Sequence, residues 1–385
     1  MKFKSLVFFS VFLCLLCACR GKDQEKDSAA AELQTSRFSV THARLFGITW
    51  LENGAKLVRD GHDRETLLVP RGAEIPEGYD NIPVVRTPIE KGFFMSTTYV
   101  GLLDALGKEA LFDTVGAVIT PVEDWTTEGI VERMKSGKTL HIPWGGMGQA
   151  GDIEGVTRLK PDVIFSGPDD QGSIIVYAES GAIQFPYVVV SEYLEETGEA
   201  MLEWIKFIAA FYNLDAEADA VYAQKLARMT ELREKAAAVP QENKPVVATG
   251  SQWMGIVYMS GAESRGALEL AAAGGLNAFA EIPGKGSTRV NLEEFVQKGK
   301  DADILLYTSM ISYLPDKQAL LAESPLFAEF RAFKNDRVYV LSKGYYINSA
   351  QVDVKFEDLT AILHPELFPG RDLTFYVKLP DTASQ

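Results

Sequence analysis

Two glutamates stand at matching positions in two similar segments of the chain. Glu154 lies two residues after Asp152, and Glu293 lies two residues after Asn291. Asp and Asn are favoured helix caps, because their side chains accept hydrogen bonds from the free N–H groups of the first turn. Each segment is therefore predicted to begin a short helix that carries the glutamate near its start. A unit used twice, with one carboxylate per copy, suggests two similar lobes that meet a roughly two-fold partner.

A glycine pattern close to the first of these segments could bind a dinucleotide. Gly146–Gly151 has the spacing G-x-G-x-x-G and follows the apolar run Leu140–Ile142. Asp169 and Asp170 lie about twenty residues further on, where an acidic residue would bind a ribose. The pattern comes late in its half of the chain, and glycines also give the backbone freedom to approach other ligands. An exported, dinucleotide-dependent oxidoreductase therefore stays open as an alternative function.

Other catalytic and metal-binding patterns are missing from the sequence. No two of the four histidines have the spacing of a metal-binding pair on a helix or strand. No G-x-S-x-G nucleophile elbow is present, so a serine hydrolase has little support. We predict no resident metal and no cofactor. The histidines are His42, His62, His141 and His364.

The first residues of the chain have the pattern of an export signal. A short basic stretch precedes the apolar run Leu6–Leu16, which is too short to span a bilayer as a mature helix. The following Cys-Ala-Cys resembles a bacterial lipobox, which implies cleavage before Cys19 and a lipid on its thiol. The alternative is an ordinary signal peptide that contains cysteines. We predict a signal peptide over residues 1–18, a charged flexible tether over 19–37, and an exported protein anchored by lipid to a bacterial membrane.

Composition narrows the class of protein further. All three cysteines lie in the signal region, which excludes a disulfide framework and a cysteine metal site in the mature protein. The formal net charge is −15 without any basic cluster, and this argues against nucleic acid as a partner. A chain of 385 residues exceeds one ordinary core, so two domains are expected.

The pattern of apolar residues predicts an α/β fold with two lobes. Apolar runs alternate with helical patterns over 38–194 and again over 240–385. Val163–Phe165 and Ile304–Leu306 are continuously apolar, as is typical of parallel strands buried on both faces. Pro161 is predicted to end the helix before the first of these strands.

Two further predictions concern the ends of helices. Gly299 is predicted to end the helix before Ile304–Leu306. Residues 195–239, between the lobes, contain no proline and have apolar residues at helical spacing. A long connecting helix is therefore expected here. Asn213–Asp215 is the point at which this helix would kink or divide in two.

Several of these features, in this order, give the chain a resemblance to a known family. They are the lipobox, the segment from Glu154 through Leu-Lys-Pro-Asp-Val-Ile, the long helix, Leu270–Gly275, the segment from Glu293 through Asp-Ala-Asp-Ile-Leu, and Leu363–Phe368. The chain resembles the substrate-binding lipoproteins of bacterial ABC importers for iron complexes and cobalamin, which are periplasmic binding proteins with a rigid helical hinge.

The resemblance implies two Rossmann-like lobes with a ligand cleft between them and no enzymatic activity. It implies a monomer that captures an iron complex, either a ferric siderophore or haem, and delivers it to an ABC permease dimer with its ATPase subunits. Cobalamin, a corrinoid, is the alternative ligand. By motif position, Glu154 and Glu293 correspond to the glutamates with which the family docks on arginines of the permease.

Ligands of α/β lobes bind beyond the carboxyl ends of the strands, which points to residues just after the predicted strands. Aromatic residues there suit a large, amphipathic ligand, although they could equally pack under loops. Arg265 could bind an anionic group of the ligand, or it could pair with Glu263 or Glu269. The predicted ligand-binding residues are Met95, Ser96, Thr97, Trp144, Gly145, Gly167, Trp253, Arg265, Tyr307 and Tyr345.

Overall fold

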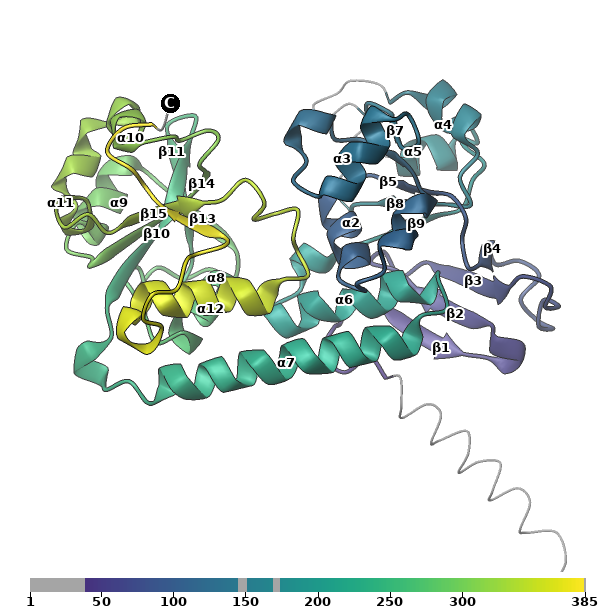
Figure 1. Ribbon diagram of the computed structural model, residues 1–385, viewed down its shortest axis with the longest axis horizontal. Coiled ribbons are helices and arrows are strands. Elements are labelled where there is room, and N and C mark those ends of the chain that lie inside the picture. Colours follow the sequence, from purple (N-terminus) through teal and green to yellow (C-terminus); the bar gives the residue numbers. More distant parts are fainter. Residues whose placement is uncertain (1–38, 145–150, 169–173, 384–385) are drawn as a thin grey trace, which may run out of the picture. The chain divides into compact units, whose positions relative to one another are not determined.

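The computed structural model describes residues 39–144, 151–168 and 174–383, and within these ranges the strands form three sheets (Figure 1). The predicted signal peptide and tether lie outside the described residues. The fold class predicted from the sequence is confirmed: helices alternate with parallel strands in each of two lobes.

The first sheet is a small addition at the start of the N-terminal lobe. Its strands follow one another in the order β1-β2-β3-β4, and only the last pair is parallel. The sequence pattern did not separate these strands from the rest of the lobe. The connections between the first three strands are too short to contain a crossover helix, so these strands pair as antiparallel neighbours. The strands are β1 (Gly47–Trp50), β2 (Lys56–Arg59), β3 (Glu65–Pro70) and β4 (Val84–Thr87).

The main sheet of the N-terminal lobe is fully parallel, with the order β7-β6-β5-β8-β9. Every residue of β8 is buried, as its apolar sequence predicts. The strands are β5 (Gly92–Phe94), β6 (Val115–Val118), β7 (Leu140–His141), β8 (Val163–Ser166) and β9 (Tyr187–Val189). The helices are α2 (Thr97–Asp104), α3 (Glu128–Lys135), α4 (Ile153–Leu159) and α5 (Ile174–Glu179), with short 3₁₀ turns η2 (Glu109–Thr114), η3 (Val122–Asp124) and η4 (Glu192–Leu194).

The sheet of the C-terminal lobe is mixed, with the order β13-β11-β10-β14-β15-β16 and β12 paired beside β10. Its centre, β10-β14-β15, is parallel. The strands are β10 (Val246–Trp253), β11 (Ile256–Ser260), β12 (Leu276–Asn277), β13 (Ser287–Val290), β14 (Ile304–Met310), β15 (Val338–Leu341) and β16 (Tyr376–Lys378). The helices are α8 (Arg265–Ala272), α9 (Leu292–Gly299), α10 (Lys317–Glu323), α11 (Arg331–Lys334) and α12 (Val352–Leu363).

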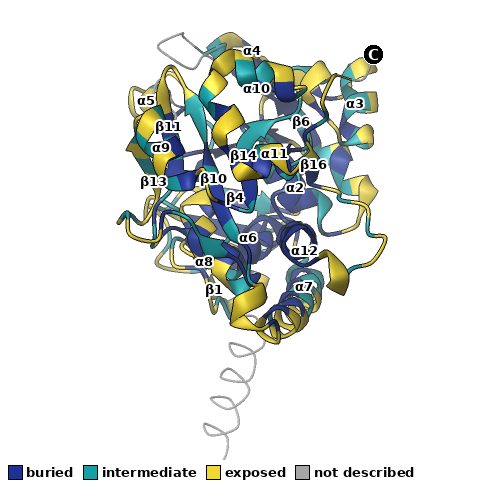
Figure 2. Cartoon of the chain, turned by 90° about the vertical axis from the view of Figure 1, so that its left-hand side faces the viewer, coloured by how far each residue is buried: buried dark blue, intermediate teal, exposed yellow. Residues whose placement is uncertain are grey.

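The segment predicted as a connecting helix contains two helices, α6 (Gly198–Ala210) and α7 (Asp215–Ala237). The chain divides at the point that the sequence singled out, where Asn213 has a positive φ of 57°. α7 lies beside both α6 and α12 (Figure 1). α6 and α12 are mostly buried, whereas α7 exposes one face (Figure 2).

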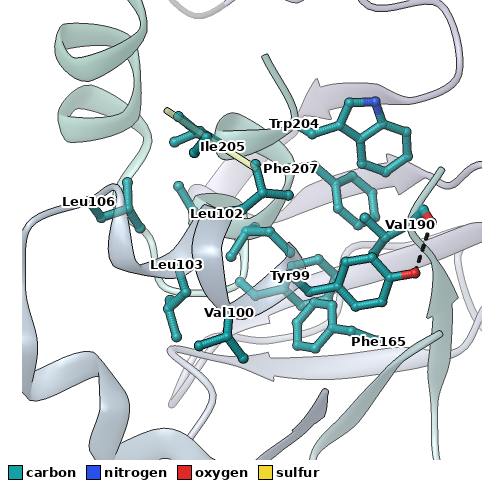
Figure 3. Packing of buried hydrophobic residues seen from close by; sticks show 14 of the residues in the cluster. Tyr99, Val100, Leu102, Leu103, Leu106, Phe165, Val190, Trp204, Ile205 and Phe207 are labelled. Carbon is teal, nitrogen blue, oxygen red and sulfur yellow. Dashed lines mark hydrogen bonds between the residues drawn. The ribbon is translucent and has the colours of Figure 1, made fainter. Parts of the chain in front are cut away.

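The core of the N-terminal lobe joins α2, the sheet and α6. Tyr99 of α2 packs close to Phe165 of β8 and to Phe207 of α6, and its hydroxyl donates to the carbonyl of Val190 at 3.2 Å (Figure 3). Ile347, from the stretch after β15, belongs to the same cluster. The C-terminal part of the chain therefore contributes to the core of the first lobe.

The two repeated segments begin as the sequence predicts. Asp152 accepts the N–H of Gly155 at 2.8 Å, and Asn291 accepts the N–H of Glu294 at 2.7 Å. α4 ends before Pro161, as expected.

α9 ends at Gly299, as the sequence predicts, but its C-cap is Lys300 with helical backbone angles and Gly299 does not have a positive φ. A Cβ at Gly299 would lie 3.0 Å from Phe330 and 3.1 Å from Phe279. The glycine is therefore required for close packing of α9 against the core and not for a left-handed helix end.

A buried carboxylate fixes the chain where the described residues begin. Glu203 of α6 is fully buried and accepts the backbone N–H groups of Thr41, His42 and Ala43 at 2.7–2.9 Å. It also pairs with Lys206 at 3.0 Å. Such charge-assisted bonds are stronger than neutral ones. They attach the segment next to the predicted tether to α6.

Removing the carboxylate of Glu203 should destabilise the fold. In Glu203→Ala the three N–H groups lose their acceptor and Lys206 loses one of its partners, so the free energy of unfolding should fall by roughly 3 kcal/mol. Urea denaturation measures this change. The exposed Glu234→Ala on α7 is the control and should stay within about 0.5 kcal/mol of the parent. A similarly small change in Glu203→Ala would contradict this role.

Candidate functional site

A groove of about 770 Å³ opens beside the carboxyl ends of β10 and β14. One wall comes from the segment after β9, and the others come from β10, β11, the start of α8 and the loop before β13. This position agrees with the rule that ligands of parallel sheets bind beyond the carboxyl ends of the strands. Its lining residues include Tyr193, Glu196, Ser251, Tyr258, Glu263, Arg265, Lys285, Thr308 and Tyr346.

Hydroxyl groups stand where the two central strands meet the groove. Thr308 of β14 donates to Ser251 of β10 at 3.0 Å between their oxygens. Tyr258, on β11, adds a phenol to the same lining. A groove with hydroxyls and aromatic rings can bind a ligand that is partly apolar and partly polar.

Arg265 joins the C-terminal lobe to the segment after β9. It is the first residue of α8, whose start is capped by Ser264. Its Nη1 donates to the carbonyls of Tyr193 and Glu195, both at 3.1 Å. Of the two glutamates that the sequence offers as partners, Glu269 pairs with Arg265, at 3.7 Å. Arg265 thus lines the groove and also holds the segment that forms its opposite wall.

The predicted ligand-binding residues of the N-terminal lobe do not line this groove. Met95 and Gly167 are buried, Ser96 caps α2, and Thr97 is the first residue of that helix. Trp144 lies against Tyr177, with 5.5 Å between the ring centroids. Gly145 lies outside the described residues, as does the glycine pattern up to residue 150.

The predicted residues of the C-terminal lobe divide between the groove and the interior. Arg265 lines the groove, whereas Tyr345 lines a smaller cavity next to it. Tyr307 is buried, and its hydroxyl contacts Glu323 and accepts the N–H of Gln252. Tyr307 of β14 therefore connects this strand to β10 and to α10 inside the lobe.

Two strands extend further than predicted. Trp253 and Tyr307 were expected in loops after their strands, but β10 continues to Trp253 and β14 to Met310. The apolar run ends at Gly250, yet the chain from there pairs with β11 in a hairpin. Met254 and Gly255 form its turn with positive φ values of 50° and 80°, and Trp253 is 64% exposed at its tip.

The sequence prediction did not include Tyr193 and Tyr258. Tyr193 follows β9 by four residues, so the strand-end rule that selected Gly167 could have found it. Tyr258 lies in β11, a hairpin partner that the apolar pattern did not reveal.

Glu192, next to Tyr193, is a buried carboxyl group with 1% exposure. Burial raises its pKa to about 7, and the opposing effect of a hydrogen bond from Thr98 is smaller. The charge of this group therefore changes near neutral pH.

The two glutamates of the repeated segments are exposed. Glu154 lies in the first turn of α4, and Glu293 lies in the first turn of α9. Both carboxylates are available to a partner.

Neither a metal centre nor a membrane-spanning helix is found in the described part of the chain. No group of three or more His, Cys, Asp and Glu side chains there could hold a metal ion. No helix within the described ranges is long and apolar enough to cross a bilayer.

Comparison with known proteins establishes the family. Residues 94–345 match the sequence pattern of the family described as periplasmic binding protein. The chain belongs to this family. It is also 29% identical, over 78% of its own length and 71% of the relative's, to an uncharacterized lipoprotein of Methanocaldococcus jannaschii.

Solved structures agree in fold. A periplasmic heme binding protein from Pseudomonas aeruginosa has a TM-score of 0.54 at 17% identity, with 77% of this chain and 99% of that one covered. A periplasmic vitamin B12 binding protein of Vibrio cholerae has a TM-score of 0.50 at 17% identity, with 73% and 99% covered.

The family defines the class of protein. Its members are extracytoplasmic solute-binding proteins that deliver a ligand to an ABC permease, and they are not enzymes. The chain is accordingly a substrate-binding protein, and the oxidoreductase alternative is not supported.

The raised pKa of Glu192 predicts a pH dependence of stability. Between its ordinary value of 4.5 and about 7, the folded protein keeps a proton that the unfolded chain has released. The contribution of Glu192 to the free energy of unfolding should therefore fall as pH rises through this window. Glu192→Gln should remove that fall, which gives up to about 3 kcal/mol more stability than the parent at pH 8 and little change at pH 4.

Denaturant titrations at several pH values measure this difference, with Glu234→Gln as the exposed control. An unchanged pH slope in Glu192→Gln would show that the burial of this carboxyl group costs nothing.

Proposed function

We propose that this chain is a lipid-anchored binding protein that captures an iron complex, either a ferric siderophore or haem, and delivers it to an ABC permease. The groove beside β10 and β14 is the observation that carries the proposal. Its volume of about 770 Å³ is that of a site for a large ligand. Cobalamin is the alternative, because the similar structures include both a heme-binding and a vitamin B12-binding protein.

The chemistry of the groove suits an amphipathic ligand with polar or charged groups, because both basic and acidic side chains line it. Tyr193, Tyr258 and Tyr346 offer aromatic faces with polar edges. Arg265 and Lys285 add positive charge. Lys285 is 3.6 Å from Glu196 on the opposite wall, and both side chains are largely exposed. A pair so exposed is weak, and an anionic ligand can displace it.

Attachment to the membrane would follow from the first residues. The lipobox-like sequence before Cys19 and the lipoprotein names of relatives support a lipid anchor at this cysteine. A charged tether over residues 19–37 would then connect the anchor to the segment held by Glu203. We expect the protein to act as a monomer.

Glu154 and Glu293 would dock on the two permease subunits. Each is exposed, stands in the first turn of a capped helix, and belongs to a different lobe. Arginine binds a carboxylate in a bidentate geometry, so one glutamate per lobe would fix the orientation of the protein on a two-fold partner.

If Glu154 and Glu293 dock on the permease, their substitution should reduce transport and leave the affinity for the ligand unchanged. The double variant Glu154→Gln, Glu293→Gln should keep its affinity for the ligand but lose at least about tenfold in uptake, since loss of two charged contacts costs more than 1.4 kcal/mol. Uptake by proteoliposomes that contain the permease and ATPase measures transport, and calorimetry measures binding. The control is Glu294→Gln, which removes a neighbouring carboxylate of the same helix turn. Normal uptake by the double variant would show that other residues dock.

The ligand class predicts a stabilised, coloured complex. Haem, cobalamin and ferric siderophores should be added separately to the purified protein, and the melting temperature and visible spectrum recorded. One of them should raise the melting temperature by mass action, with about 2.7 kcal/mol of stabilisation at a concentration of 100 Kd. Tyr258→Ala, in the groove, should reduce this effect. A protein that none of the three stabilises would not be a carrier of these complexes.

A further inference from the structure

A smaller cavity of about 150 Å³ lies next to the groove, and both lobes contribute to it. Tyr193, Arg265 and Tyr346 line the groove and the cavity alike. We call this space the inner cavity. Its other lining residues are Thr98, Glu192, Met201, Met229, Glu269, Tyr345, Ser349, Val352, Lys355, Phe356, Leu359 and Tyr376.

One wall of the inner cavity carries an unsatisfied carboxyl oxygen. Glu192 is 1% exposed, and its Oε2 has no hydrogen-bond partner in the structure. A buried acceptor without a partner destabilises the fold, and more so when it is charged. Native proteins usually satisfy such an atom with water or a ligand.

Another wall carries an ammonium group without a counter-charge in contact. Lys355 of α12 is 9% exposed, and its Nζ lies 4.6 Å from the ring centre of Tyr345 and 5.4 Å from that of Phe375. Glu269 lines the same cavity and attracts this ammonium group, but no described carboxylate lies within the 4.0 Å of an ion pair with it. Aromatic faces compensate only part of the cost of burying a cation. Burial lowers the pKa of Lys355 to about 7, as expected for a poorly compensated charge.

The size of the inner cavity limits what it can hold. A cavity of about 150 Å³ accepts a molecule such as benzene, with about six non-hydrogen atoms. Haem and corrinoids are far larger. Met201, Met229 and Leu359 supply an apolar surface between the two charged walls. The complementary molecule is therefore short and partly aliphatic, with a positive and a negative end.

We propose that the inner cavity binds a small zwitterion, an ammonium and a carboxylate on a short aliphatic frame, with the ammonium at Glu192 and the carboxylate at Lys355. Such a molecule would contact both buried groups directly, whereas a cation or an anion could contact only one of them. Glu192 lies in η4 and Lys355 in α12, so the bound zwitterion would connect the two sides of the junction between the lobes. This proposal does not depend on which iron complex or corrinoid the groove binds.

Calorimetry on the unmodified protein tests the proposal with small probes. Alanine, β-alanine and γ-aminobutyrate differ in the spacing of their charges, while propionate and propylamine each lack one charge. At least one zwitterion should bind at least about tenfold more tightly than both single-charge analogues, because each unpaired buried charge costs more than 1.4 kcal/mol. If no zwitterion binds at millimolar concentration, the cavity holds ordered water only and the proposal is wrong. If propionate or propylamine binds equally well, the cavity does not select a zwitterion and the proposal is also wrong.

Two substitutions test whether Glu192 and Lys355 bind the two charged ends of the zwitterion. Glu192→Gln and Lys355→Met keep the shape of the side chains, and each should weaken zwitterion binding at least about tenfold. Glu234→Gln and Lys138→Met, on the exposed surface, should leave it unchanged. If a variant fails to fold, the comparison of zwitterions with propionate and propylamine in the unmodified protein still tests the proposal. Folded variants with unchanged affinity would place the probe elsewhere and overturn the assignment.

A zwitterion could be a free amino acid or the aminocarboxylate end of a larger cargo. Nε-dansyl-lysine has this end on a flexible arm that carries a bulky fluorophore. If it binds with an affinity close to that of the best small zwitterion, the cavity accepts an arm reaching in from the groove. If the small zwitterion binds and the dansyl derivative does not, the site takes free molecules. Failure of the haem, cobalamin and siderophore tests would leave either result unaffected.

Discussion

The packing of α7 against both α6 and α12 (Figure 1) is the constraint on which the rest of the molecule depends. α6 belongs to the core of the N-terminal lobe through Trp204 and Phe207, while α12 belongs to the C-terminal core through Phe356 and Leu359. Ion pairs add to this contact: Lys225 with Asp353 at 2.8 Å, and Arg228 with Glu357 at 2.5 Å. Because close-packed interiors deform little, the lobes can shift only slightly against this layer of helices.

Charged side chains are buried at this junction between the lobes. The segment after β9 leads to α6, and it lies against the first residue of α8. Arg265 holds this segment through two backbone carbonyls, and Glu192 and Lys355 are thereby buried on either side of one cavity. Charges in such a place are costly unless paired, so they indicate a function more strongly than the aromatic residues nearby. The large groove and the inner cavity meet at Arg265, which connects cargo binding with the junction of the lobes.

The sequence predicted the parts of the fold that depend on local pattern. The caps at Asp152 and Asn291, the buried parallel strands β8 and β14, and the break near Asn213 all follow from neighbouring residues. The antiparallel additions did not: β11 is apolar but pairs with β10 through a hairpin that the pattern does not reveal, and β13 has a weak apolar pattern and pairs with β11.

The candidate site was less predictable for the same reason. The strand-end rule located the right edge of the sheet, but it could not tell that Tyr307 points into the core toward Glu323 while Thr308 reaches the groove. A shift of one residue along a strand reverses the side that a residue faces. Glu192 and Lys355 are 163 positions apart in sequence, and only the packing of α12 brings them to one cavity.

The central claim is that the two lobes form a stiff pair, and a distance measurement tests it most directly. The sequence after residue 19 has no cysteine, so spin labels can be placed cleanly at Lys138→Cys in the N-terminal lobe and Glu329→Cys in the C-terminal lobe. Double electron–electron resonance on the free protein should give one peak, as narrow as that of a control pair within one lobe, Lys138→Cys with Glu179→Cys. A much broader distribution, or two peaks, would contradict the claim, because the helices would then act as a flexible hinge.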